Sequence, residues 1–86
     1  MVQLTATVKN SLGIHARPAA LIVQAASRFR SEILLSKDGM EVNGKSIMGV
    51  MMLAAETGAE IVVRAEGEDE EKAARELVRV IESKFD

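Results

Sequence analysis

The stretch Gly13–Ala20 (GIHARPAA) constrains the fold most, because it holds the only proline and the only histidine among 86 residues. Residues before it alternate between apolar and polar, as in a half-buried strand, and residues after it follow the helical period. Proline is tolerated only in the first turn of a helix, where its missing N–H leaves no bond unmade. Because the residue before a proline is disfavoured in helical geometry, the pattern leaves open whether the helix begins at Ala16 or at Pro18.

The rest of the chain divides into further strands and helices at turn signals. Alternation and apolar runs predict four strands, at Val2–Val8, Ser31–Lys37, Met40–Val42 and Glu60–Glu66. Asp38-Gly39 is a strong hairpin signal between two of them. Helical periodicity predicts three helices, at Ala16–Phe29, at Ile47–Ala55 with Gly58 as the residue after its end, and after Gly67 and Asp69. The predicted core stripes are Ala19, Ile22, Val23, Ala26 and Phe29 on the first helix, and Ala74, Leu77, Val78, Ile81 and Phe85 on the last.

This order predicts a single α+β domain over residues 1–86, with a four-stranded, mainly antiparallel sheet covered on one face by helices. The formal net charge is −2 and only two residues are aromatic, which disfavours direct binding of nucleic acid. Because the chain has no cysteine and one histidine, we expect no disulfide, metal site or bound cofactor. No apolar run is long enough for a membrane span, and Met1–Thr5 does not resemble a signal peptide, so we expect a soluble cytoplasmic protein.

His15 is the candidate for chemistry. A neutral imidazole is a good nucleophile, and a phosphoryl group on its ring would lie at a helix N-terminus, where free N–H groups and the helix dipole favour an anion. Arg17 offers a guanidinium fork to phosphoryl oxygens. From these residues alone, an ordinary loop histidine beside a solvated arginine is the simpler interpretation, and a phosphoryl acceptor is the alternative.

The segment from Ser46 to Ala55 carries two further candidates. Ser46 is placed to cap a helix, and a serine there can also accept a phosphate with little damage to the helix. The helix is uncharged, and Ile47, Val50, Met51 and Ala54 form one predicted face, with Met48, Met52 and Ala55 on the other. Full burial is the alternative, but a domain this small favours an exposed, methionine-rich docking patch. Leu21 falls outside the core stripe of its helix and is expected to be partly exposed.

Two motifs together resemble the HPr family, the histidine phosphocarriers of the bacterial phosphoenolpyruvate:sugar phosphotransferase system. Gly-Ile-His-Ala-Arg-Pro-Ala at 13–19 is similar to the family's active-site motif. Lys-Ser-Ile-Met-Gly-Val-Met at 45–51 is similar to its regulatory serine segment, in the style of Gram-positive members. The resemblance covers essentially the whole chain. It implies the family's open-faced β-sandwich, with three helices over a four-stranded antiparallel sheet in the order β-α-β-β-α-β-α.

The resemblance also implies a role for each matched residue. His15 would take a phosphoryl group on Nδ1 from phosphorylated enzyme I and pass it to a sugar-specific enzyme IIA domain, while Arg17 stabilises the charge. Ser46 would be the target of HPr kinase/phosphorylase, and its phosphorylation would slow this transfer and promote binding of a catabolite-control transcription factor. The implied docking patch consists of Ala20, Leu21, Ile47, Met48 and Met51.

A phosphorylated carrier of this kind is not itself an enzyme, and no nucleotide-binding loop or hydrolase motif suggests otherwise. A monomer is the default expectation. Two other interpretations of the sequence stay open. One is a regulatory binding protein that uses Ser46 and the methionine patch in carbon catabolite control. The other is a carrier that serves a nitrogen-regulatory branch of the phosphotransferase system.

Overall fold

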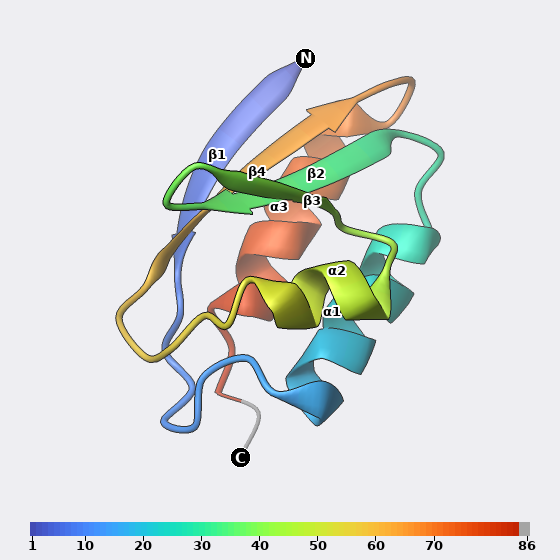
Figure 1. Ribbon diagram of the computed structural model, residues 1–86. Coiled ribbons are helices and arrows are strands. Elements are labelled where there is room, and N and C mark those ends of the chain that lie inside the picture. The colour runs from blue at the N-terminus through green and yellow to red at the C-terminus, as the bar shows by residue number, and fades with distance from the viewer. Residues whose placement is uncertain (85–86) are drawn as a thin grey trace.

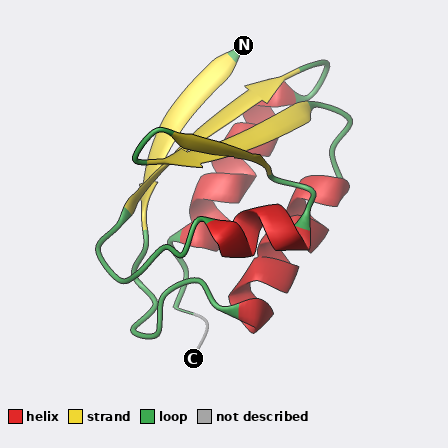
Figure 2. Cartoon of the chain, viewed as in Figure 1, coloured by secondary structure: helices red, strands yellow, loops and turns green. Residues whose placement is uncertain are grey.

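The computed structural model describes residues 1–84. Within that range the elements are β1 (Val2–Thr7), α1 (Ala16–Ser27), β2 (Glu32–Lys37), β3 (Met40–Asn43), α2 (Ile47–Met52), β4 (Glu60–Glu66) and α3 (Glu70–Ile81) (Figure 1). The strands form one sheet in the order β1-β4-β2-β3, and each neighbouring pair is antiparallel. All three helices lie on one side of this sheet (Figure 2). The predicted α+β open-faced sandwich is therefore confirmed.

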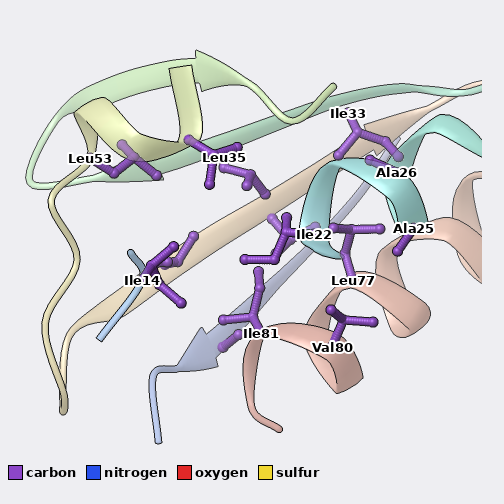
Figure 3. Packing of buried hydrophobic residues seen from close by; sticks show 14 of the residues in the cluster. Ile14, Ile22, Ala25, Ala26, Ile33, Leu35, Leu53, Leu77, Val80 and Ile81 are labelled. Atoms are coloured by element: carbon purple, nitrogen blue, oxygen red, sulfur yellow. The ribbon is translucent and has the colours of Figure 1, made fainter. Parts of the chain in front are cut away.

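The core lies between the sheet and the helices. Alternate residues of β4, namely Ile61, Val63 and Ala65, are buried on the helical face, as period-two patterning predicts. Ile22 of α1 and Leu77 of α3 are fully buried against them (Figure 3). Burying each large aliphatic side chain contributes about 1.5–3 kcal/mol, so this layer supplies most of the hydrophobic stabilisation of a small domain.

The first helix is shorter than predicted. It ends at Ser27 and not at Phe29, because the chain then turns toward the start of α3. The backbone N–H groups of Arg30 and Ser31 both donate to the carboxylate of Asp69, at 3.0 and 2.9 Å. These two bonds, which link residues 38 and 39 positions apart, determine where the helix stops. No local sequence signal marks that position.

The predicted core stripe of α1 was right for three of its five members, Ala19, Ile22 and Ala26. Val23 and Phe29 are only half-buried and pack against the edge of the core. Pro18 and Ala25 are buried in addition. The burial pattern of α1 is therefore rotated slightly from the predicted one, toward α3, with which α1 is in contact.

The last helix follows the sequence pattern closely. Ala74, Leu77 and Ile81 are fully buried, and Val78 is half-buried against the same cluster. Phe85, the fifth residue of the predicted stripe, lies outside the described residues. No helix within residues 1–84 is both long enough and apolar enough to cross a membrane.

The prediction for the second helix was wrong at its C-terminal end. Helix α2 ends at Met52, three residues before Ala55. Ala54 has a φ of +49° and takes the left-handed position after the helix that was predicted for Gly58. Gly58 instead belongs to the turn before β4, where its N–H donates to the oxygen of Val8 at 2.8 Å.

The early end of α2 also changes which residues are buried. Val50 is the buried residue of the helix, whereas Ile47 and Met51, predicted to share its face, are exposed. Beyond the reversal at Ala54, Leu53 and Ala55 are both buried. A left-handed alanine costs about 1–2 kcal/mol, which these two buried side chains can offset.

Candidate functional site

His15 stands at the junction predicted from the sequence, directly before α1. It is the N-cap residue, with extended backbone angles, and its carbonyl oxygen accepts from the N–H of Ala19 at 2.9 Å. The helix begins at Ala16, so Arg17 lies within the first turn and not before it. Pro18 follows, at a position where an N–H would have no intrahelical acceptor in any case. The side chains of His15 and Arg17 are exposed.

The N-terminus of α1 is open. The side chain of His15 makes no capping bond, and no acidic residue lies in the first turn. Within residues 1–84, the N–H groups of Ala16 and Arg17 have no hydrogen-bond acceptor. Such a terminus carries the positive end of the helix dipole and unsatisfied donors, and both favour an anion. An anion attached to the imidazole of His15 would therefore meet a favourable potential without any rearrangement of the helix.

Gly13 and Ile14, which precede His15, fix the direction from which the chain enters α1. Gly13 has a φ of +71°, and a Cβ atom there would lie 2.6 Å from the carbonyl oxygen of Ala55. Only glycine fits this close approach. The next residue, Ile14, donates its N–H to the same oxygen at 2.8 Å and points its side chain into the core (Figure 3). His15 is thus exposed, while Gly13 and Ile14 are held against Ala55.

Ser46 caps α2, as predicted. Its Oγ accepts from the N–H of Gly49 at 3.1 Å, and its carbonyl oxygen accepts from the N–H of Val50 at 2.9 Å. The hydroxyl is half-buried at the edge of the molecule. The neighbouring Lys45 turns its ammonium group toward the C-terminus of α1, where Nζ donates to the oxygen of Phe29 at 2.8 Å.

The predicted docking residues are exposed or partly exposed on α1 and α2, and we call this set the α1–α2 patch. Its exposed members are Leu21, Ile47, Met48 and Met51, with Ala20 partly exposed beside them. Met48 is 73% exposed, and α1 and α2 are in direct contact. An apolar surface left open in this way on a small domain is typical of a docking site.

Two further apolar residues are exposed outside the predicted docking set. Leu12 is 75% exposed in the loop before His15, and Met52 is 62% exposed at the end of α2. Met52 was predicted on the second face of its helix but not among the docking residues. The sequence signal that could have identified Leu12 is a large apolar residue inside a loop, next to Gly13.

His15 and Ser46 lie at opposite ends of the α1–α2 pair. Ile14 is bonded to Ala55, just beyond the C-terminal end of α2, whereas Lys45 at its N-terminal end is bonded to Phe29 beyond the C-terminus of α1. The two helices therefore run in opposite directions. Because α1 has 12 residues, about 18 Å of helix separates these two junctions.

No other cluster competes as a reactive site within residues 1–84. No group of three or more histidine, cysteine, aspartate or glutamate residues could hold a metal ion there. The ion pairs of α3, Arg75 with Glu71 and Arg79 with the half-buried Glu76, lie at the surface and connect neighbouring turns of that helix. Pairs of this kind contribute a few tenths of a kcal/mol and organise no pocket.

Residues 2–83 match a family model described as PTS HPr component phosphorylation site. The phosphocarrier protein HPr of Treponema pallidum is 54% identical over 86 residues, covering 100% of this chain and 98% of that protein. The HPr-like protein Crh of Bacillus subtilis is 50% identical over 82 residues, covering 95% and 96%. A crystal structure of HPr-C-His from Thermoanaerobacter tengcongensis superposes with a TM-score of 0.93 at 53% identity, covering 99% and 96%.

The fold and the matched region together define a small phosphocarrier domain of the phosphotransferase system. The chain belongs to the HPr family. The resemblance inferred from its two motifs is confirmed.

Proposed function

We propose that this chain is a phosphocarrier that accepts a phosphoryl group on Nδ1 of His15 from phosphorylated enzyme I and passes it to a sugar-specific enzyme IIA domain. Family membership supports the class of function. The observation that supports the site is the open N-terminus of α1, where an exposed imidazole stands beside two N–H groups with no acceptor in the described part of the chain.

The transfer requires little from this chain beyond placement and charge stabilisation. The lone pair of Nδ1 attacks phosphorus, and the new N–P bond forms as the bond from phosphorus to the donor protein breaks. The ring proton stays on Nε2. The N–H groups of Ala16 and Arg17 and the guanidinium of Arg17 then face the added negative charge, and charge-assisted hydrogen bonds of this kind are about twice as strong as neutral ones. The reverse sequence delivers the group to the next acceptor.

The α1–α2 patch is the proposed docking surface for enzyme I and for enzyme IIA. A partner that covers Leu21, Met48 and Met51 would bury exposed apolar area next to His15. Flexible methionine side chains can adapt to more than one partner, which a carrier between two proteins requires. We expect a monomer to be the active form, because the patch and the acceptor are both exposed on one chain. Light scattering at working concentration would give the mass of one chain.

Ser46 is the proposed regulatory site, phosphorylated by HPr kinase/phosphorylase and then bound by a catabolite-control transcription factor. A phosphate there would add about −1.5 to −2 charge at the far end of the patch from His15. It would hinder docking of a partner with an acidic surface without refolding the carrier. The similarity to the HPr-like protein Crh, at 50% identity, keeps one alternative in view, a regulatory binding protein that uses Ser46 and the methionine patch in carbon catabolite control.

The test is phosphorylation by phosphoenolpyruvate and a matched enzyme I, followed by intact mass, for the wild-type chain and for His15→Ala. We expect one acid-labile phosphoryl group on wild type and none on the variant. Ser46→Ala is the control, because it keeps the acceptor and should still be labelled. If an active enzyme I leaves the wild-type chain unlabelled, the carrier function is wrong. Labelling by ATP and HPr kinase at Ser46 would then support the regulatory alternative.

A further inference from the structure

Two buried polar side chains stand out within residues 1–84, Asn10 and Ser31. Ser31 lies in the turn that leads to β2, where its hydroxyl donates to Asp69 and closes the end of α1. Asn10 lies in the loop between β1 and His15. The two loops are at opposite ends of the molecule (Figure 1). Ser31 serves the fold far from the candidate site, whereas Asn10 is five residues from the acceptor.

Asn10 closes the turn that precedes His15. Its side-chain Nδ2 donates to the carbonyl oxygen of Gly13 at 2.8 Å, and its own carbonyl oxygen accepts from the N–H of Gly13 at 3.0 Å. The hydroxyl of Thr57 donates to the same oxygen of Asn10. Residues 10–13 are therefore a hydrogen-bonded ring, joined across the surface to the loop that precedes β4.

The hydrogen-bonded ring of residues 10–13 is connected to His15, the proposed phosphoryl acceptor. Gly13 is held between the Asn10 side chain and the carbonyl oxygen of Ala55, and Ile14 is bonded to that same carbonyl. His15 follows directly and begins α1. With the side chain of Asn10 removed, the oxygen of Gly13 loses its donor in a buried position. Gly13 could then rotate and change the direction of the chain at His15.

We propose that Asn10 is a positioning residue for His15, which holds the backbone turn that aims the imidazole at the incoming phosphoryl group. The inference rests on the proposed function and adds a residue to it. Asn10 makes no contact with the reacting atoms and acts through Gly13 and Ile14. In-line transfer is sensitive to misplacement of about 1 Å, so a small change of this turn lowers the rate well before it unfolds the domain.

The unpaired oxygen of Asn10 supports a positioning role over a purely stabilising one. Its Oδ1 atom is buried and has no hydrogen-bond partner within the described residues. Burying an unsatisfied acceptor is unfavourable, so an apolar side chain of similar size would avoid that cost. What an apolar residue could not supply is the donor to Gly13. The amide is thus suited to fix the geometry of this turn and is a poor choice for stability alone.

The experiment compares Asn10→Ala with Ser31→Ala, a matched removal of the other buried polar side chain. Phosphoryl transfer from phosphorylated enzyme I is measured at a temperature where both variants are folded, together with the melting temperature. We expect Asn10→Ala to lower the maximum rate about tenfold, with half-saturation by enzyme I unchanged within about twofold because the α1–α2 patch is intact. Ser31→Ala should lower the melting temperature and leave the rate within about twofold of wild type.

Thr57→Val is the second variant, because Thr57 is exposed and its loss removes one bond to Asn10 without opening the core. We expect a two- to threefold slower transfer, which keeps the inference testable even if Asn10→Ala does not fold. Transfer at the wild-type rate in folded Asn10→Ala, or in Thr57→Val when Asn10→Ala is unfolded, overturns the positioning role alone. Equal slowing in Ser31→Ala also overturns it. A wild-type chain that takes no phosphoryl group overturns the proposed function, and this inference with it.

Discussion

Helices α1 and α3 have the same length, 12 residues, yet their N-termini are built in opposite ways. Helix α3 supplies its own negative charge, with Glu70 and Glu71 in the first turn after Asp69. Glu70 accepts from the N–H of Gly67 at 3.1 Å and pairs with the chain's terminal amino group at 2.9 Å. Helix α1 has no acidic residue in its first turn, and neither helix has a side-chain hydrogen bond at its N-cap.

Hydrogen bonds lower the pKa of two carboxyl groups at the start of α3, those of Asp69 and Glu70. Hydrogen bonds from the Ser31 hydroxyl and from the Arg30 and Ser31 N–H groups lower the pKa of Asp69 to about 2. The hydrogen bond with the terminal amino group and the one from Gly67 lower the pKa of Glu70. The positive end of α3 thus has acidic residues of the chain itself beside it. The positive end of α1 is left for a group from outside, which is what a phosphoryl acceptor requires.

The largest effect should come from removing the one cationic side chain at the open terminus. Arg17→Ala should lower the rate of phosphoryl transfer to His15 by about 10- to 100-fold, because a charge-assisted hydrogen bond contributes about 1.5–3 kcal/mol. The melting temperature should stay the same, since Arg17 is exposed. Stopped-flow or quench-flow transfer from phosphorylated enzyme I measures the rate. Arg75→Ala on α3 is the control and should transfer normally; an unchanged rate in Arg17→Ala would show that the guanidinium has no part in transfer.

A second substitution, Ala16→Asp, gives α1 an acidic residue in its first turn, as α3 has. Ala16→Asp would place a carboxylate in the first turn, where it stabilises the helix by about 0.3–1 kcal/mol and competes with a phosphoryl group for the same N–H groups. We expect a higher melting temperature and a transfer rate about two- to fivefold lower, because each 1.4 kcal/mol of lost stabilisation corresponds to a factor of ten. Ala16→Asn controls for size without charge. A wild-type rate in Ala16→Asp would mean that the open terminus is irrelevant to the reaction.

Substitutions at Ser46 separate capping from charge at the start of α2. Ser46→Ala should cost about 1 kcal/mol of stability through loss of the bond from Gly49. Ser46→Asp keeps an N-cap acceptor and adds charge, so we expect several-fold slower transfer from enzyme I with an unchanged circular dichroism spectrum. Ser46→Asn provides a cap without the charge and should transfer like wild type. Equal rates for the Asp and Asn variants would argue against electrostatic regulation at this position.

The smallest expected effect on transfer comes from the terminus of α3. Because the pKa of Asp69 is lowered in the folded chain from 3.8 to about 2, its ionised form stabilises the fold above about pH 4. That contribution is lost as the pH falls from about 4 to about 2. Asp69→Asn should therefore melt at a lower temperature at neutral pH, and its difference from wild type should shrink in acid. Thermal melts across this pH range measure it, and transfer to His15 near neutral pH should be unaffected.

Local patterns were sufficient for most of this fold and for the position of His15. The four strands follow from alternation, and α3 follows from its amphipathic stripe. The position of His15 at a strand-to-helix turn could be predicted from the proline nearby. The roles of Arg17 and Ser46 came from the two motifs, and the match to the HPr family supports the class of function to which those motifs belong.

What the sequence could not predict depends on contacts between distant segments. Helix α2 stops at Met52 because Leu53 and Ala55 turn into the core and the carbonyl of Ala55 meets Ile14, 41 positions earlier. In the sequence, Asn10 belongs to a polar break between elements. It is buried because its turn folds against Thr57, 47 positions later. Neither contact has a periodic or compositional signature.

The most direct test of the open terminus is an amide NMR spectrum of the ¹⁵N-labelled chain before and after phosphorylation by enzyme I. If a phosphoryl group on His15 occupies the N-terminus of α1, the amide resonances of Ala16 and Arg17 should move strongly, since their N–H groups gain an anionic acceptor. Those of Glu70 and Glu71 in α3 should not move. A phosphorylated chain in which the amides of Ala16 and Arg17 stay in place would contradict this assignment of the site.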